Sequence, residues 1–374
     1  MKTSSLLIGA AVAALLTAAS GAAFAQSWAD TTTVSGRMYY DVSSVTRKVD
    51  GVTSDSTSGN ALGANNTNGT GFDIKRFYIG VDHKFTDMFS ANVTTDFQYN
   101  STLGATELYL KKAYFDITVS PQFDVKIGAT DLPWVPYAEG IYGNRYVENT
   151  LIDRKYAFKP GASVAGFGTS SDWGLHAAGT FGVPADGNTL SYQVSLINGN
   201  GYKNPSRTKT MDWEGRLSAV VGYQWNFAIG GYSGKLGQSV TGVATPQTAT
   251  RFDALAAWVG DQGRVGVEYF SANDYTSTLV KSTTPDKADG YSVFGTYRFN
   301  HDWSTFGRYD DVKPSKTMNP STKDRYYNVG VTYSAFKNVD FSLVAKHEDA
   351  SSVVSAVGHK TTANELGIFS QFRY

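Results

Sequence analysis

Apolar and polar residues alternate with a period of two along most of this chain. In the clearest run, residues 89–100, Phe89, Val93 and Phe97 share one face with other apolar residues, while Asn92 and Asp96 lie on the polar face. Successive side chains of a β-strand point to opposite faces, so each run predicts a strand with one apolar and one wet face. Sixteen strands are predicted, near residues 33–45, 76–82, 89–100, 112–117, 123–128, 172–182, 189–198, 211–223, 227–237, 250–259, 263–272, 288–299, 302–310, 324–334, 339–348 and 362–374.

Short and mostly longer connections alternate between these strands. The short ones fall at 86–88, 119–122, 183–188, 224–226, 260–262, 300–301 and 335–338, and aromatic residues flank most of them. Short turns on one rim, long loops on the other and an aromatic girdle are typical of outer-membrane barrels. Many runs also reach the length that a tilted strand needs to cross a bilayer, whereas sandwich strands average five or six residues. We therefore expect an all-β fold, a closed antiparallel transmembrane barrel over residues 26–374, with a water-filled channel.

The first 25 residues have the features of a cleaved signal peptide. Lys2 precedes an apolar stretch from Leu6 to Leu16, and Ala23-Phe24-Ala25 forms an A-x-A cleavage site. We therefore expect the protein to be exported and to reside in the cell outer membrane. The 33 basic and 33 acidic residues balance, so composition favours no nucleic-acid partner, and the absence of cysteine excludes disulfides and thiolate metal sites.

Four stretches carry a resemblance to a known family. They are residues 110–116 (LKKAYFD), 123–128 (FDVKIG) leading to Pro133, 172–182 (DWGLHAAGTFG) and 190–199 (LSYQVSLING). With the terminal aromatic strand ending at Tyr374, they resemble Gram-negative outer-membrane porins of the 16-stranded superfamily, and among them the phosphate-selective porin group. The resemblance implies a homotrimeric channel whose third external loop folds inward. Phosphate-selective members line their channel with an arginine and lysine ladder, which is not evident here.

Residues 132–171 break the alternation and form the longest connection. Loops of this length are usually functional or disordered, and Pro133, Trp134 and Tyr137 argue against disorder. We expect this segment to fold into the barrel, with Lys112 and Tyr114 as wall partners. The alternative is a solvated external loop. If the segment narrows the channel, its charged residues are the candidate constriction: Glu139, Arg145, Glu148, Asp153, Arg154 and Lys155.

The polar faces of the strands supply the candidate pore wall. Twelve basic and twelve acidic residues fall there, which predicts weak charge selectivity rather than a ring of one sign. The wall candidates singled out are Arg37, Asp41, Arg76, Asp96, Lys112, Tyr114, Asp116, Lys126 and Arg216.

The expected function is passive diffusion of small hydrophilic solutes and ions. An anion-selective, phosphate-selective or other substrate-specific porin is the main alternative, and a surface adhesin or receptor barrel is a weaker one. No G-x-S-x-G, H-E-x-x-H, EF-hand or P-loop pattern occurs, so an enzyme is not expected, nor is a metal or cofactor.

Overall fold

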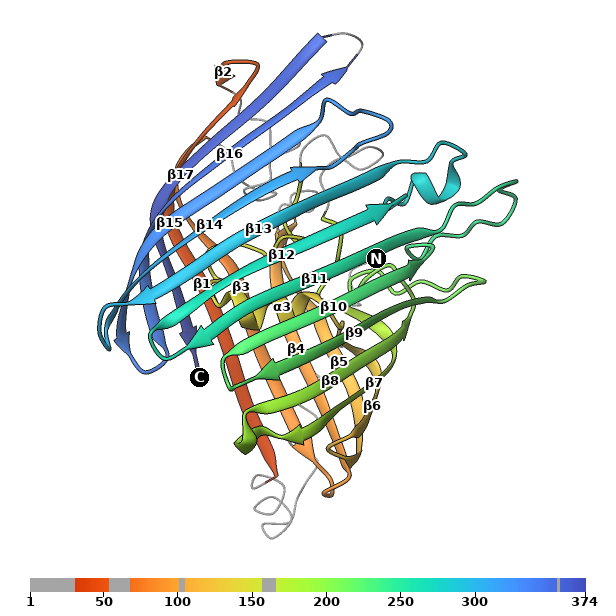
Figure 1. Cartoon of the computed structure of the whole chain (residues 1–374), viewed down its shortest axis with the longest axis vertical. Helices are drawn as coiled ribbons and strands as arrows, with labels where there is room; N and C mark the ends of the chain where they lie inside the picture. Colours follow the sequence, from red (N-terminus) through yellow and green to blue (C-terminus); the bar gives the residue numbers. More distant parts are fainter. Residues whose placement is uncertain (1–30, 54–67, 101–104, 157–165, 355–356) are drawn as a thin grey trace.

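The computed structural model describes residues 31–53, 68–100, 105–156, 166–354 and 357–374. The expected signal peptide lies outside these residues. Sixteen long antiparallel strands and the two-residue strand β2 (Val52–Thr53) form one sheet, and β1 pairs with β17 to close it into a barrel (Figure 1). The long strands are β1 (Thr32–Val49), β3 (Gly69–Lys84), β4 (Phe89–Asn100), β5 (Ala105–Ser120), β6 (Phe123–Asp131), β7 (Ser171–Val183), β8 (Asn188–Ile197), β9 (Asp212–Val221), β10 (Trp225–Gly234), β11 (Ala249–Gly260), β12 (Gly263–Asn273), β13 (Lys287–Arg298), β14 (Trp303–Lys313), β15 (Lys323–Phe336), β16 (Val339–Val354) and β17 (Val357–Arg373). The predicted sixteen-stranded closed barrel is confirmed.

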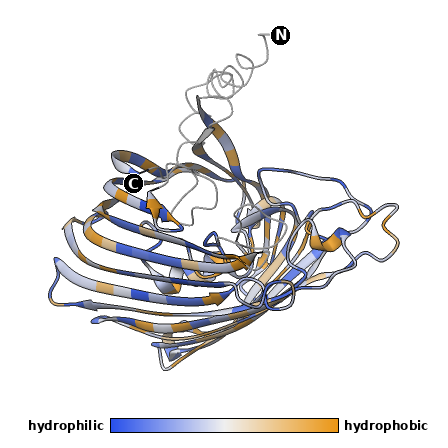
Figure 2. Ribbon diagram, turned by 90° about the horizontal axis from the view of Figure 1, so that it is seen from above, coloured by the Kyte–Doolittle hydropathy of each residue, from blue (hydrophilic) through white to orange (hydrophobic). Residues whose placement is uncertain are grey.

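The alternation in the sequence sets which side of the wall each residue occupies. Along β15, exposed and buried residues alternate from Lys323 to Tyr333, and Figure 2 shows the same alternating colours along the other strands. Apolar side chains such as Val329 and Val331 are exposed on the outer face, while polar side chains such as Asn328 are buried inside. This inverts the pattern of a water-soluble protein, as a lipid-facing wall requires.

Short turns gather at one rim of the barrel and longer connections at the other. Tyr374 at the carboxyl end is hydrogen-bonded to Gly36 near the start of β1, so both ends of the barrel wall lie at the short-turn rim. Within the described residues, no helix is long and apolar enough to cross a membrane.

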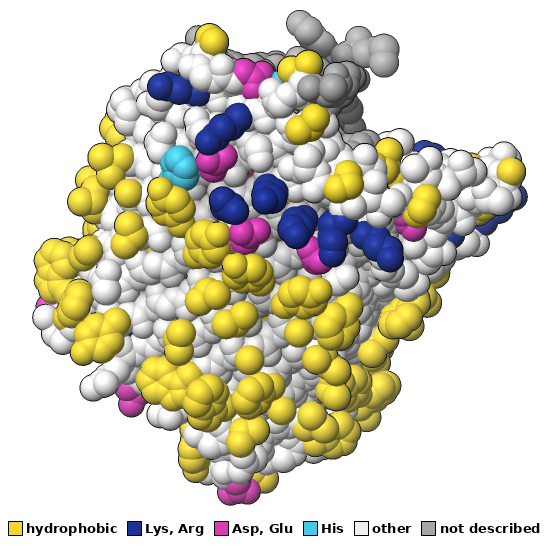
Figure 3. All heavy atoms as spheres, turned by 45° about the horizontal axis from the view of Figure 1, so that its top comes forward, with side chains coloured by type: hydrophobic (Ala, Val, Ile, Leu, Met, Phe, Trp, Pro, Cys, Tyr) yellow, Lys and Arg dark blue, Asp and Glu magenta, His cyan; other side chains and the backbone are white. Residues whose placement is uncertain are grey.

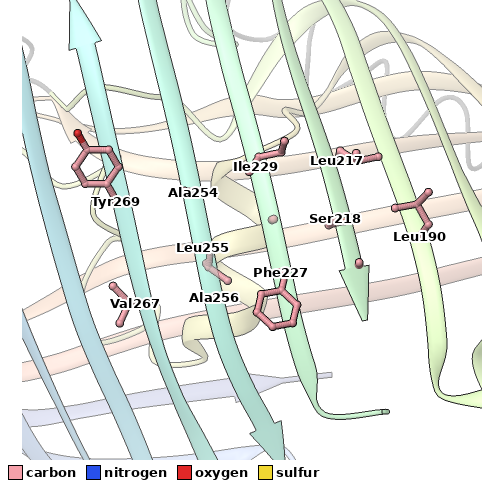
Figure 4. A pocket seen from close by; sticks show the side chains of 12 residues that line it. Leu190, Leu217, Ser218, Phe227, Ile229, Ala254, Leu255, Ala256, Val267 and Tyr269 are labelled. Carbon is pink, nitrogen blue, oxygen red and sulfur yellow. The ribbon is translucent and has the colours of Figure 1, made fainter. Parts of the chain in front are cut away.

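The outer face is apolar even where it is hollowed. A depression of about 440 Å³ lies over β8–β12, where small residues such as Ala254 and Ala256 leave space between larger side chains (Figure 4). Most of its larger lining residues, including Leu217, Phe227 and Ile229, are exposed, whereas Leu255 is buried. The depression belongs to the lipid-facing side and is separate from the lumen.

Among the described residues, three helical elements interrupt the strands. The α-helix α3 (Val135–Tyr142) lies inside the barrel behind β10–β12, and the 3-10 helices η1 (Pro184–Asp186) and η2 (Leu279–Lys281) lie in connections. The largest cluster of buried apolar side chains joins α3 and the residues after it to the inner faces of β10–β14. The lumen is therefore partly filled by the segment between β6 and β7.

Candidate functional site

The segment after β6 enters the lumen through a short helix. Pro136 occupies the first turn of α3, where its missing N–H leaves no hydrogen bond unmade. The helix ends at Gly143, whose φ of 80° is the left-handed conformation that glycine adopts without strain. A Cβ on Gly143 would also meet the Arg264 guanidinium at 2.3 Å, so glycine lets the segment approach β12.

Trp134 anchors the start of the segment to the wall. Its backbone N–H donates to the Glu214 carboxylate at 3.0 Å, and its indole N–H donates to Glu268 at 2.9 Å. The indole also covers Gly230, where a Cβ would lie 2.5 Å from the ring. Trp134 is fully buried, so burial of its large apolar ring adds to two charge-assisted hydrogen bonds.

Several wall side chains bind the middle of the segment through its backbone. Arg264 donates to the carbonyl oxygens of Gly140 and Ile141, and Lys346 donates to that of Val147 at 2.7 Å. Lys346 also lies 3.6 Å from the Glu148 carboxylate. Segment carbonyl groups inside the barrel thus find partners on β12 and β16, which fixes the segment against this half of the wall.

Arg154 forms the most heavily paired contact of the segment. Its guanidinium is bonded to Asp310 on β14, Asp324 on β15 and Glu348 on β16, and it is only 1% exposed. The rings of Tyr156 and Tyr326 lie 4.6 and 4.8 Å from the guanidinium carbon. Arg154 was expected to face the channel, but in the structure it points into the wall, because three carboxylates there provide its partners.

Other charged residues of the segment face the remaining space. Arg145 donates to Glu139 at 2.5 Å and lies 3.5 Å from Asp153, and all three side chains are partly exposed. Arg145 interacts electrostatically with Arg76 and Tyr78 on β3, and Glu139 interacts with Arg37 on β1. The segment therefore meets β1 at Tyr146, whose ring centre lies 6.3 Å from that of Tyr39, while Arg145 faces the β3 wall.

The wall candidates form their own pairs. Asp41 lies 3.3 Å from Lys75, and Arg76 lies 3.3 Å from the buried Asp96. Lys112 pairs with Asp131 at the end of β6. Lys112 thus contacts the residue that directly precedes the inward segment, and the role of Lys112 and Tyr114 as its wall partners stays a prediction.

Lys126 on β6 and Arg216 on β9 are two further wall candidates. Lys126 joins Asp116 and Asp124 and lies 5.7 Å from the Tyr114 ring centre. The Arg216 guanidinium carbon lies 4.1 Å from the ring centre of Tyr137, a residue of α3. Arg216 is thus the wall candidate that stacks on the segment.

Two β-bulges bring basic residues into the lumen that strict alternation misses. The pairing of β3 with β1 skips Lys75, and the pairing of β5 with β4 skips Lys111. A bulge places an extra residue on one strand and shifts the side-chain phase. Lys75 and Arg76 therefore both make lumenal contacts, as do Lys111 and Lys112.

Lys111 belongs to a cluster of bases and tyrosines. Its ammonium lies 4.7 Å from the Tyr78 ring centre and 5.5 Å from that of Tyr202 in the β8–β9 loop. Lys203 lies 4.3 Å from the Tyr109 ring, which stacks on Tyr202. Tyr202 and Lys203 lie in a loop without alternation, and only the fold brings them to β3 and β5.

Comparison with known proteins agrees with this architecture. The family model for phosphate-selective porin O and P matches residues 51–374. No curated protein matches the sequence.

Several solved structures share the fold. The outer-membrane channel DcaP of Acinetobacter baumannii is 12% identical with a TM-score of 0.60, covering 92% of this chain and 97% of its own. An anion-selective porin from Comamonas acidovorans is 10% identical with a TM-score of 0.57, covering 92% and 99%. OmpT of Vibrio cholerae in its trimer form is 12% identical with a TM-score of 0.53, covering 92% and 99%. With a closed barrel, a polar lumen and a family match over most of its length, this chain is an outer-membrane channel and belongs to the phosphate-selective porin O and P family.

Proposed function

We propose that the protein is a passive diffusion channel whose narrowest part lies between residues 132–156 and the wall formed by β1 and β3–β6. The observation that carries this proposal is the placement of Glu139, Arg145 and Asp153. They line the lumenal side of the inward segment and lie within electrostatic reach of Arg37 and Arg76 on the facing wall. A solute crossing the membrane would pass between these two charged surfaces.

Both signs of charge line this passage, which supports weak overall selectivity. On the segment, Arg145 is shared by two carboxylates, and on the wall Arg76 is paired with Asp96. Opposite charges facing a narrow lumen set up a transverse field that orients polar solutes without excluding either ion. General permeation of small hydrophilic solutes is the function that this arrangement supports best.

A specific observation favours an anion preference as the second candidate. Lys111 binds only neutral groups in its described contacts, namely the hydroxyls of Tyr78 and Ser170, and Lys203 lies nearby over Tyr109. Lys203 is exposed in the β8–β9 loop, where an entering anion would meet it first, and Lys111 is largely buried beneath Tyr202. The resulting preference would add to the balanced charges of the narrow part.

We further propose a homotrimer, which the architecture shared with porins supports. One similar structure is described as a trimer form. Size measurement of the protein extracted in mild detergent tests this directly, and a monomer under conditions that preserve the fold would contradict it.

Reversal potential in a planar bilayer tests the channel function. Under a tenfold KCl gradient, we expect ion conductance with a small reversal potential. Its magnitude should stay well below that of a channel that conducts chloride alone or potassium alone. Absence of conductance from correctly folded protein would contradict a channel. A reversal potential close to that of a purely chloride-conducting channel would contradict weak selectivity and support the anion-selective alternative.

The histidine on the inner wall supports no catalytic alternative. His176 Nδ1 lies 2.8 Å from the Ser195 hydroxyl, and its other ring nitrogen lies 3.3 Å from the Gly128 carbonyl oxygen. A serine–histidine nucleophile also needs a group that holds the histidine as a base, and a solute must reach the serine. Here Ser195 is fully buried in the wall, so this pair supports a structural role.

A further inference from the structure

A band of basic residues crosses the outer surface of the barrel near its long-loop rim. On β13–β17 and their connections, exposed lysine and arginine side chains follow one another from strand to strand, and Figure 3 shows a row of them along the upper edge of the apolar surface. We call this set the basic band, and its members are Lys287, Lys313, Lys316, Lys323, Arg325 and Lys360.

The strand register shows that these bases form a continuous surface. Asp289 on β13 pairs with Lys313 on β14, and Asp311 on β14 pairs with Arg325 on β15. Arg325 in turn pairs with Asp349 on β16. Neighbouring strands are about 4.8 Å apart, so the band spans several strands at one level of the barrel.

A row of aromatic rings lies directly below the band. On β15, Tyr327 is the outward residue next to Arg325 on the side toward the membrane. Tyr327 pairs with Tyr309 on β14 and with His347 on β16, so the three rings lie side by side. The Tyr327 and His347 rings stack with centroids 5.0 Å apart. Aromatic belts mark the level of the lipid headgroups, so the basic band lies at or just above the headgroups of the outer leaflet.

Three carboxylates lie within the band, and each is already paired. Asp289 binds Lys316, Asp311 binds Arg325 at 3.3 Å, and Asp349 binds Lys360 at 2.8 Å. Among the described residues, the ion pairs of this strip involve Lys316, Arg325 and Lys360, and none involves Lys287, Lys313 or Lys323. Six bases against these three carboxylates give a net charge of +3, which the Asp50 carboxylate beside Lys360 reduces to +2.

We propose that the basic band binds the phosphate groups of the anionic glycolipid in the outer leaflet. Phosphate-bearing headgroups are the anions that a membrane presents at this depth, and lysines close to the surface attract them. Lys287, Lys313 and Lys323 provide the ammonium groups, and the aromatic row beneath them contacts the sugar and upper acyl region. The band faces away from the lumen, so this binding is independent of solute passage.

The test compares lipid binding by the full protein and two triple variants in the same detergent. The probes are diphosphorylated lipid A and its dephosphorylated form, and the affinity of each is measured by native mass spectrometry. The test variant is Lys287→Gln/Lys313→Gln/Lys323→Gln. The control variant, Arg207→Gln/Lys209→Gln/Lys337→Gln, removes the same charge from an external loop and from the short-turn rim.

We expect the test variant to bind diphosphorylated lipid A about 10 to 100 times more weakly than the unmodified protein. Each lysine near a membrane surface contributes about 1 kcal/mol, and about 1.4 kcal/mol corresponds to a tenfold change in affinity. The control variant should bind like the unmodified protein, and dephosphorylated lipid A should not distinguish the three. Unchanged conductance of the test variant shows that it is folded.

Equal affinity of the test variant and the unmodified protein for diphosphorylated lipid A would overturn the proposal. Equal binding of both lipids by the unmodified protein would do the same. A test variant that loses subunit association while its lipid affinity stays unchanged would assign the band to contacts between copies of the chain instead.

Discussion

The Arg154 guanidinium donates to the Glu348 carboxylate at 2.8 Å and so ties the inward segment to a strand 194 positions further along the chain. The same guanidinium reaches Asp310 and Asp324, and all four side chains are almost completely buried. Three carboxylates around one arginine are stable only while the arginine is present, because each would otherwise be an uncompensated buried charge. Arg154 therefore holds the far end of the segment against β14–β16.

Replacing this arginine tests its role as an anchor. We expect Arg154→Gln to destabilise the protein by about 3 to 5 kcal/mol, the usual cost of breaking a buried ion pair. Thermal unfolding measures the loss of stability, and larger fluctuations of the open-channel current report a loosened segment. Arg145→Gln is the matched control, since Arg145 is more exposed and its ion pairs among the described residues are with Glu139 and Asp153 of the same segment. Equal effects of the two changes would show that Arg154 is not a special anchor.

Deleting Gly140–Asn149 tests whether the segment narrows the channel. The deletion removes Arg145 and the backbone groups bound by Arg264, Lys346 and Arg308, while the contacts of Trp134 and Arg154 remain. We expect a higher single-channel conductance and passage of larger sugars in liposome swelling. The control removes Ser239–Pro246 from an external connection and should leave both unchanged. An unchanged sugar cutoff in the folded deletion variant would place the constriction elsewhere.

Adjacent residues on β4 test the assignment of the two wall faces. Val93 is 49% exposed on the outer face, whereas the Thr94 hydroxyl donates to Asn92 on the lumenal face. Val93→Arg places a charge in lipid and should cost about 2 to 4 kcal/mol near the bilayer midplane, while Thr94→Arg should cost little. Equilibrium unfolding in lipid vesicles measures both. A larger loss for Thr94→Arg would reverse the face assignment.

The charge of Lys203 should make ion selectivity depend on pH. Partial burial and the nearby positive charges of Arg76, Lys155 and Lys111 lower the pKa of the Lys203 ammonium to about 8, although part of the side chain stays open to solvent. A base with a lowered pKa is charged below that value and loses its charge as the pH rises through it. We therefore expect the chloride-to-potassium permeability ratio to fall between pH 6.5 and 9.

The matched variant for this prediction is Lys203→Gln, which has no charge to lose at this position. Its permeability ratio should be lower at pH 6.5 and change less up to pH 9. Reversal potentials at both pH values in the same salt gradient provide the measurement. Identical pH profiles of the two proteins would remove Lys203 from the ion path.

Much of the barrel wall follows from local patterning. The apolar face that contains Val93 and the polar face that contains Asp96 are adjacent in the sequence, and the period of two places them on opposite sides of one sheet. The phase of short and long connections then orients the strands. The alternation also predicted the number of long strands and the lumenal position of residues such as Arg76 and Asp116. Closure of the sheet follows because a lipid-spanning sheet must pair every backbone group.

The tertiary structure decided which charges meet. The bulges at Lys75 and Lys111 shift the side-chain phase, and the sequence shows no sign of them, because a bulge depends on the register with a neighbouring strand. Composition shows that Arg154 is charged, but its partners lie on three strands far along the chain, so its burial depends on where the segment packs. The sequence thus determined the wall and its two faces, since these depend on near neighbours. The path of the inward segment and the pairing of its charges were decided by contacts between residues far apart in the chain.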